Sequence, residues 1–286
     1  MIEKITEVYN RSQIKFETKK EWEHWVLVGA DLHLDNPHTD RKLIKHHLEQ
    51  AKDRQATTIY IGDIFDAMQG KSDRRASKSD LMQMHKESNY LNRLVEDAYD
   101  FLSPYRDNLS LISEGNHETA ITKHMEYSLL DGLCYLLRKD GSTVVRAGYR
   151  GYIRFQFEHP AGGRRQSYLL YYHHGAGGGG PVTKGVIQTN RKAVYLPDVD
   201  IVVQGHIHEK WIFPITRARI TKGGTEFLDY QYHIQIPTYK DEFTNLSGGY
   251  HHEGGRPPKP VGAYWLRFYY STRSEKVEMQ ILEADR

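Results

Sequence analysis

Carboxylate and imidazole side chains stand directly behind apolar runs of this sequence, and both kinds of side chain bind metals. The stretch VVQGHIHEK places His206 and His208 behind β-branched residues, and GADLH places Asp31 and His33 behind another apolar run. By itself, the pair of His206 and His208 is more typical of solvated residues at the end of a strand. Further apolar runs end in clusters of the same composition: Asp63 with Asp66, Asn116 with His117, and His173 with His174. The recurrence favours a shared site.

The clusters offer nitrogen and oxygen ligands without thiolate. Imidazole, carboxylate and amide groups suit Mn, Fe, Zn or Co, whereas a structural zinc site uses cysteines, and Cys134 is the only cysteine. Residues two apart in an extended chain point the same way, so each Asp-x-His or His-x-His pair can face one site. The groups are too many for one catalytic ion. They indicate two ions roughly 3.5 to 4 Å apart that share a carboxylate.

The elements that would position these groups follow an α/β pattern. Helix-like stretches separate the early apolar runs, which predicts right-handed crossovers and an α/β sheet in the first half of the chain. From Val144 onward the pattern is mostly strands, which predicts a second, largely antiparallel sheet packed on the first. The expected strands cover 25–31, 57–63, 109–116, 168–175 and 199–206, and the expected helices cover 40–53 and 89–105.

A chain of 286 residues with this pattern is predicted to be a single domain, 1–286. Two segments interrupt the pattern without ending it: a polar, basic excursion at 67–88 and a Gly/Pro-rich loop at 246–260. Because strands resume after each, both are predicted to be functional loops rather than linkers.

Composition restricts the partners. The net charge is +2, so global electrostatics do not by themselves predict a nucleic-acid or membrane partner. No apolar run approaches the roughly 18 residues of a membrane span, and the first residues are polar, so we expect no membrane partner and no export. With one cysteine, a reducing compartment fits and the cytoplasm is the default. The sequence has 16 histidines, and this number favours a metal site because histidine is the commonest metal ligand. The oligomeric state is not readable.

The motifs GADLH, GDIFD, GNHE, HHG and GHIH occur in this order and resemble the five signature blocks of the calcineurin-like metallophosphoesterase superfamily. The resemblance spans Asp31 to His208, and five ordered blocks are far more specific than any one of them. It implies an α/β fold of four layers, an αββα sandwich of two mixed sheets flanked by helices. It also implies two divalent ions, with Mn as the favoured metal and Fe, Zn, Co or Ni as alternatives.

The resemblance assigns a role to each block. It implies a first metal on Asp31, His33 and His208, a second on Asn116, His174 and His206, and Asp63 as the bridge between them. His174 is preferred to His173 because the family's ligand directly precedes the glycine. His117 would be the acid that protonates or hydrogen-bonds the leaving oxygen. Asp66 is assigned a supporting catalytic role, orienting a ligand or loop, and a helix N-cap is an equal alternative.

The activity implied is hydrolysis of a phosphoester by a hydroxide that bridges the metals. A phosphodiester of a nucleotide, DNA or RNA is the favoured substrate, and a phosphomonoester of a small molecule or protein is the alternative. A non-catalytic scaffold is the weaker rival, because it predicts ligand losses. Lipid-precursor pyrophosphatases of the superfamily typically carry arginine where this chain has His117. Candidate substrate contacts are Arg74, Arg75, Tyr250 and His251. The 20 tyrosines are expected mostly to pack within strands, with Tyr171 or Tyr250 as candidates for stacking on a base.

Overall fold

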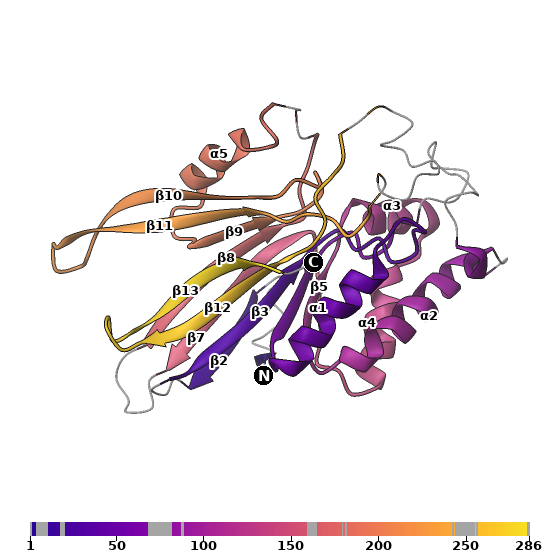
Figure 1. The fold of residues 1–286 in the computed structure, drawn as a ribbon, viewed down its shortest axis with the longest axis horizontal. Coiled ribbons are helices and arrows are strands. Elements are labelled where there is room, and N and C mark those ends of the chain that lie inside the picture. Colours follow the sequence, from indigo (N-terminus) through magenta and orange to yellow (C-terminus); the bar gives the residue numbers. More distant parts are fainter. Residues whose placement is uncertain are drawn as a thin grey trace.

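The computed structural model describes residues 2–3, 11–17, 21–67, 82–86, 89–158, 165–178, 180, 182–241, 243, 255 and 257–284. Within them the chain forms two β-sheets that pack face to face, with helices outside both (Figure 1). The helices are α1 (Arg41–Asp53), α2 (Tyr90–Leu102), α3 (Asn116–Met125), α4 (Leu129–Lys139) and α5 (Ile187–Tyr195), with short 3-10 turns at Gln83–His85 and Ser103–Tyr105.

The first sheet has six strands in the order β13-β12-β3-β4-β5-β6. Its strands are β3 (Glu23–Gly29), β4 (Thr57–Ile61), β5 (Leu109–Ser113), β6 (Val145–Ala147), β12 (Tyr264–Ser271) and β13 (Lys276–Glu283). The strands from β3 to β6 are parallel to one another, as expected for strands joined by helical crossovers. The antiparallel β12–β13 hairpin extends this sheet beside β3.

The second sheet has seven strands in the order β1-β2-β7-β8-β9-β11-β10. Its strands are β1 (Ile2–Glu3), β2 (Arg11–Glu17), β7 (Arg150–Glu158), β8 (Arg165–His173), β9 (Ile201–Gln204), β10 (Trp211–Ile220) and β11 (Glu226–Gln235). The pairs β2–β7, β8–β9 and β9–β11 are parallel, and the others are antiparallel.

Two predictions about this sheet were wrong. The second sheet is mixed rather than largely antiparallel, and the strands after residue 263 join the first sheet. Alternation in a sequence gives the two faces of a strand, but it carries no information about which sheet the strand joins. The side chains of β12 lie on both faces of the first sheet: Trp265 packs with the helices, while Leu266 and Phe268 pack between the two sheets.

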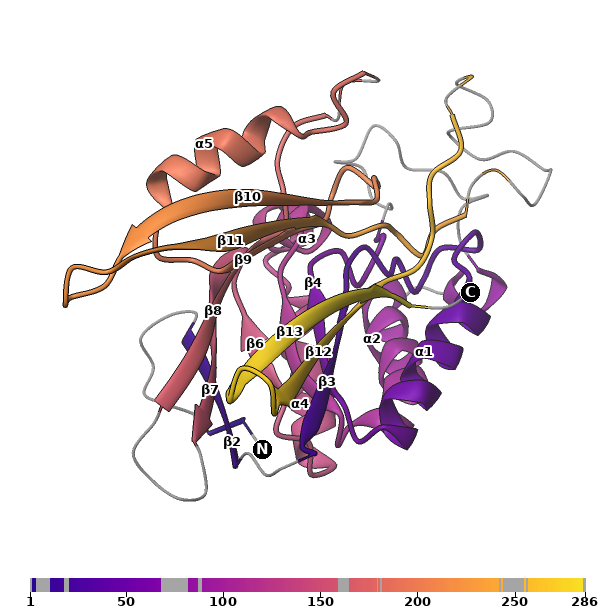
Figure 2. The same cartoon turned by 60° about the vertical axis from the view of Figure 1, so that its left-hand side comes forward.

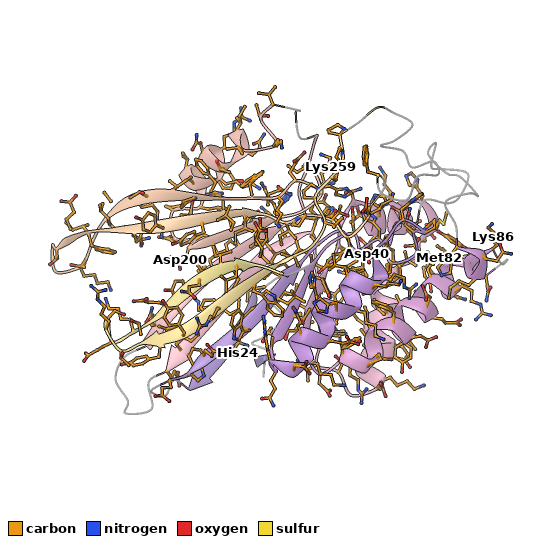
Figure 3. The ribbon with its side chains drawn as sticks, viewed as in Figure 1. His24, Asp40, Met82, Lys86, Asp200 and Lys259 are labelled. Atoms are coloured by element: carbon orange, nitrogen blue, oxygen red, sulfur yellow. The ribbon has the colours of Figure 1, made fainter. Side chains whose placement is uncertain are left out.

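Successive residues of one strand build two separate cores. Leu27 faces α1, α2 and α4, where it packs with Leu43 and Leu133, whereas Val26 and Val28 face the second sheet. Asp40 caps the N-terminus of helix α1, and its carboxylate accepts the backbone N–H of Leu43 at 2.9 Å (Figure 3). Helix α5 lies over the outer face of the second sheet (Figure 2). The predicted αββα sandwich of two mixed sheets is therefore confirmed.

Among the described residues, no helix has both the length and the apolar character needed to cross a membrane.

Candidate metal centre

The candidate site lies where five strands of both sheets end. The carboxyl ends of β3, β4 and β5 meet those of β8 and β9 at one edge of the sandwich (Figure 2). Backbone hydrogen bonds join the segments that follow: Asp31 N–H donates to Gly62 O at 3.1 Å, and Gly205 N–H donates to His174 O at 2.8 Å. Side chains far apart in sequence are thereby held on one common frame.

Five of the seven candidate ligands share an unusual backbone conformation. Positive φ angles occur at Asp31 (52°), His33 (46°), Asp63 (49°), His206 (72°) and His208 (54°). Residues other than glycine rarely adopt this left-handed region, and such strain, about 1–3 kcal/mol each, concentrates at functional sites. The expectation that the Asp-x-His and His-x-His pairs are extended was therefore wrong, because the strands end before them.

The first group consists of Asp31, His33 and His208. One ligand atom from each lies within 4.8 Å of the others. His208 Nε2 is 3.3 Å from Asp31 Oδ1. Among the described residues, the buried atoms Asp31 Oδ1 and His33 Nε2 have no hydrogen-bond partner. Buried polar atoms are ordinarily satisfied, so these two fit a cation.

The second group consists of Asp63, His174 and His206, whose ligand atoms also lie within 4.8 Å of one another. Asn116 joins it, since Asn116 Oδ1 is 2.7 Å from His206 Nδ1 and 3.1 Å from His174 Nε2. The carboxylate of Asp63 is 3.1 Å from His174 Nε2. His206 and His208 thus face different groups, although one residue separates them.

His173 does not reach either group. Its Nδ1 accepts the backbone N–H of Gly175 at 2.9 Å, and its ring lies against Tyr149 at a centroid distance of 5.3 Å. His174 is fully buried, and its Nδ1 lies 3.1 Å from the carbonyl of Ile61. That contact leaves Nε2 directed at Asp63, so the structure brings His174 rather than His173 into the candidate centre.

The charges of the centre are strongly coupled in the absence of metal. Burial opposes protonation of His174, but the carboxylate of Asp63 outweighs burial and raises the pKa of the imidazole to about 10. Conversely, burial opposes ionisation of Asp63, but His174 and His117 hold the pKa of its carboxyl far below the ordinary value. The protonated imidazole of His174 thus offsets the negative charge of the Asp63 carboxylate, a role that a bound cation would otherwise take.

His117 and Asp66 lie beside the first group. His117 is the second residue of helix α3, and its Nδ1 is 2.5 Å from the carbonyl of Asp66. Its Nε2 is 3.7 Å from Asp63 Oδ2. Asp66 Oδ1 is 2.9 Å from His33 Nδ1, and Asp66 Oδ2 accepts the side-chain N–H of Asn36 at 2.6 Å. Asp66 therefore contacts a candidate ligand directly.

Three charged residues that were not predicted to belong to the site support these loops. Glu118 is buried and accepts the backbone N–H groups of Asp63, Phe65 and Gly115 at 3.1, 2.9 and 2.8 Å. Asp35 accepts the N–H groups of Asp66 and Ala67, and Lys240 Nζ lies 3.5 Å from Asp66 Oδ1. Glu118 and Asp35 stand within or just after the quoted motifs, so their position was a usable signal. Nothing in the sequence points to Lys240.

Glycines allow the loops to approach so closely. Gly62 has a positive φ of 72°, and a Cβ there would overlap the ring of His174. A Cβ at Gly115 would overlap the carboxylate of Asp63. Any larger residue at either position would displace a candidate ligand.

A lysine lies at the same end of the molecule as the centre. Lys259 Nζ donates to the carbonyl of Ile207 at 3.3 Å and to Glu209 at 2.5 Å (Figure 3). The predicted substrate contacts Arg74, Arg75, Tyr250 and His251 lie outside the described residues. Tyr171 is 3% exposed, so the alternative expectation that it stacks on a base was wrong.

No family model and no curated protein matches the chain. Among solved structures, a conserved uncharacterised protein and predicted phosphoesterase from Streptococcus pneumoniae TIGR4 is 9% identical, with a TM-score of 0.35, over 92% of this chain and 99% of that chain. Vps29 complexed with Zn from Entamoeba histolytica is 11% identical, with a TM-score of 0.32, over 91% and 98%.

A putative 5'-nucleotidase from Staphylococcus aureus is 15% identical, with a TM-score of 0.42, over 93% of this chain and 55% of that chain. All three likenesses are too distant to bear on activity, which is inferred from the site's own residues.

Proposed function

We propose that this chain is a metal-dependent phosphoesterase of the calcineurin-like type, acting on a phosphodiester of a nucleotide or nucleic acid. The observation that carries the proposal is the convergence of two ligand groups at the strand ends, with the Asp63 carboxylate and the Asp31 carboxylate both within 4.0 Å of His174 Nε2. The order of the five motifs and the left-handed backbone at the same residues support it.

The donor set fits two divalent ions. Asp31, His33 and His208 would hold one ion, Asn116, His174 and His206 the other, and Asp63 would contact both. Divalent ions supply Lewis acidity, which acidifies water and offsets phosphoryl charge. Oxygen and nitrogen donors without thiolate accept several such ions, and manganese is the favoured choice.

His117 is proposed to hydrogen-bond and protonate the leaving oxygen. The contact of its Nδ1–H with the Asp66 carbonyl fixes the ring, and in the protonated imidazole the Nε2–H is then left to donate to the leaving oxygen. Nε2 faces the centre beside Asp63, and the side chain retains 11% exposure, so a bound substrate can reach it. Proton donation to a departing oxygen contributes typically 10²- to 10⁴-fold in rate.

Asp66 is proposed to position His33. Its carboxylate faces His33 Nδ1, so the Nε2 of the same ring is left for an ion. Lys240 and Asn36 in turn hold the carboxylate. Partners of this kind fix the tautomer and orientation of metal-bound histidines. Arg74, Arg75, Tyr250 and His251 remain the proposed contacts for the rest of the substrate.

The test compares hydrolysis of bis-p-nitrophenyl phosphate with that of p-nitrophenyl phosphate. Chelator-stripped protein is refilled with manganese, and the wild type is measured beside His117→Ala and His124→Ala. His124 lies exposed on the same helix, α3, and serves as the matched control. We expect preferential turnover of the diester, a loss of about 10²-fold or more in His117→Ala, and little change in His124→Ala.

Other outcomes would point elsewhere. Faster hydrolysis of the monoester would support the phosphomonoesterase alternative. Absence of metal-dependent turnover of either compound would contradict the proposal and favour a non-catalytic scaffold.

A further inference from the structure

A strip of arginine and tyrosine side chains runs over the outer face of the second sheet. In β7 the exposed residues alternate with buried ones: Arg150, Tyr152 and Arg154 face outward, while Ile153 and Phe155 pack between the sheets. With a rise of about 3.3 Å per residue, the two arginines lie about 13 Å apart with the tyrosine midway. The strand therefore presents cation, aromatic ring and cation in a straight row.

Helix α5 adds a second edge to this row. Its last residue, Tyr195, is 60% exposed and interacts electrostatically with Arg150 and Tyr152. Arg191 is exposed one helical turn earlier, on the same face of α5. Together these residues form the Arg–Tyr strip, defined as Arg150, Tyr152, Arg154, Arg191 and Tyr195.

The arginines of the strip lack acidic partners among the described residues. Arg154 donates to Ser167 Oγ at 3.2 Å, and burial raises the pKa of the Tyr171 hydroxyl while Arg150 lowers it. Neither of these arginines nor Arg191 forms an ion pair with another described residue. Other arginines do: Arg41, Arg146, Arg217 and Arg267 each lie against a carboxylate. The nearby Asp200 is engaged by Arg217 at 3.2 Å. Within the described part of the chain, the positive charge of the strip is therefore not paired with carboxylates, on a protein whose net charge is only +2.

One end of the strip adjoins the candidate metal centre. Arg150 is the register partner of His173, which directly precedes His174. Tyr149, the residue before Arg150, places its ring 5.3 Å from His173 and 5.4 Å from His174. The same pair of strands, β7 and β8, therefore carries the strip on its outer face and a candidate ligand at its end.

We propose that the Arg–Tyr strip binds a single-stranded nucleic acid and leads it to the metal centre beside His174. Phosphates pair with the arginines, and unstacked bases lie on the exposed rings of Tyr152 and Tyr195. Alternation of cations and aromatic rings along a groove or face is the usual basis of sequence-tolerant strand binding. The role in substrate delivery rests on the proposed function, whereas the binding itself does not.

The test is a direct binding measurement that does not need turnover. The full chain is titrated into a fluorescein-labelled oligothymidylate in the presence of EDTA, so that the strand stays intact, and anisotropy is recorded over a range of salt concentrations. We expect saturable binding that weakens with salt and is tighter for the single strand than for a duplex of the same length.

Two variants remove opposite features of the strip. Arg150→Gln/Arg154→Gln should weaken binding at least 10-fold and reduce the slope of log K against log salt by about 1.4, the value for two phosphate contacts on a single strand. Tyr195→Ala should weaken binding by about 10-fold, whereas Tyr195→Phe, which keeps the ring, should stay within about twofold of the wild type.

The matched control is Lys52→Gln/Lys139→Gln. These exposed lysines lie in α1 and α4, over the other sheet, and their loss changes the net charge by the same amount. The proposal is overturned by an absence of strand binding, by equal losses in strip and control variants, or by oligoglutamate competing as well as the strand. Because binding is measured without metal, failure of the strip and failure of the hydrolase proposal are distinguishable.

Discussion

The carboxylate of Glu118 accepts a hydrogen bond from the backbone N–H of Asp63 at 3.1 Å, across 55 positions of sequence. The same oxygen accepts the N–H of Gly115, and the other oxygen accepts the N–H of Phe65. One buried carboxylate thus fixes the loops after β4 and β5 relative to each other. The position of Asp63, proposed to contact both ions, depends on this link.

Replacing Glu118 with glutamine should therefore destabilise the protein. In the wild type, both carboxylate oxygens of Glu118 accept backbone N–H groups. A carboxamide has a single acceptor oxygen, so in the variant the NH₂ group would face a backbone N–H and neither donor would have an acceptor. A buried donor left without a partner costs about 1–3 kcal/mol, and more when the acceptor was charged. We expect Glu118→Gln to lower the free energy of unfolding by about 2–4 kcal/mol in urea titrations.

A surface carboxylate provides the comparison for Glu118. Glu96 pairs with Arg93 on α2, with its side chain 51% exposed, so Glu96→Gln should change stability by less than about 0.5 kcal/mol. If Glu118→Gln changed the free energy of unfolding as little as Glu96→Gln, Glu118 would not hold the two loops together.

Much of the fold followed from local patterns. The expected helices at 40–53 and 89–105 are α1 and α2 with the 3-10 turn after it, because caps and helical periodicity are local properties. The assignment of β12 and β13 to a sheet was not predictable, because pairing of Tyr264 with Val28 joins residues far apart in sequence. The order of the motifs predicted that the candidate ligands would meet at one site, but it did not predict their backbone conformation.

Those contacts of the site that join segments distant in sequence could not be predicted from the sequence. Lys240 reaches Asp66 from a position far along the chain, and no local signal marks it. The Arg–Tyr strip is local at Arg150, Tyr152 and Arg154, yet Tyr195 joins it only through the packing of α5 on the second sheet. Sequence patterns give the composition of such sites but not their tertiary partners.

Asp66→Asn should weaken metal binding without unfolding the chain. The substitution removes the charge that orients His33 through Nδ1, while the size of the side chain is kept. Loss of such a partner typically reduces metal affinity 10- to 100-fold. Manganese affinity measured by calorimetry should fall by that factor.

Asp97→Asn separates this effect from general destabilisation. Asp97 is a partly buried carboxylate held by Arg41 at 2.7 Å and by His85 at 3.3 Å, and it contacts none of the candidate ligands in the described residues. Its replacement should cost stability but leave manganese affinity near the wild-type value. Equal affinities for Asp66→Asn and the wild type would exclude the positioning role.

Lys192 gives a prediction about pH. Burial under α5 lowers the pKa of Lys192 to about 8, and its ammonium contacts Gln204 Oε1. Because the folded pKa lies below the ordinary value of about 10.4, the unfolded chain binds more protons, so this group makes stability rise between pH 8 and 10.4. Lys192→Met removes the cost of burying the ammonium, and it should be more stable than the wild type at pH 7 by about 3 kcal/mol.

The measurement is the difference in unfolding free energy between Lys192→Met and the wild type at two pH values. The gap should narrow from pH 7 to pH 9.5, since the wild type loses its buried charge over that interval. A gap that stays constant would show that Lys192 is not charged and buried in the folded protein.

Cys134 should be unreactive in the native protein. The thiol is 1% exposed within the core of α4 and the first sheet, and burial raises its pKa to about 11. A thiol that is buried and protonated does not attack thiol reagents. Ellman's reagent at pH 8 should detect no thiol until denaturant is added, and rapid labelling of the folded chain would contradict the packing of α4.

The central claim is most directly tested by anomalous diffraction at the manganese edge from crystals of the metal-loaded protein. The account predicts two peaks, one among Asp31, His33 and His208 and the other among Asn116, His174 and His206, with the Asp63 carboxylate between them. A single peak, or manganese bound away from these side chains, would contradict the two-metal centre.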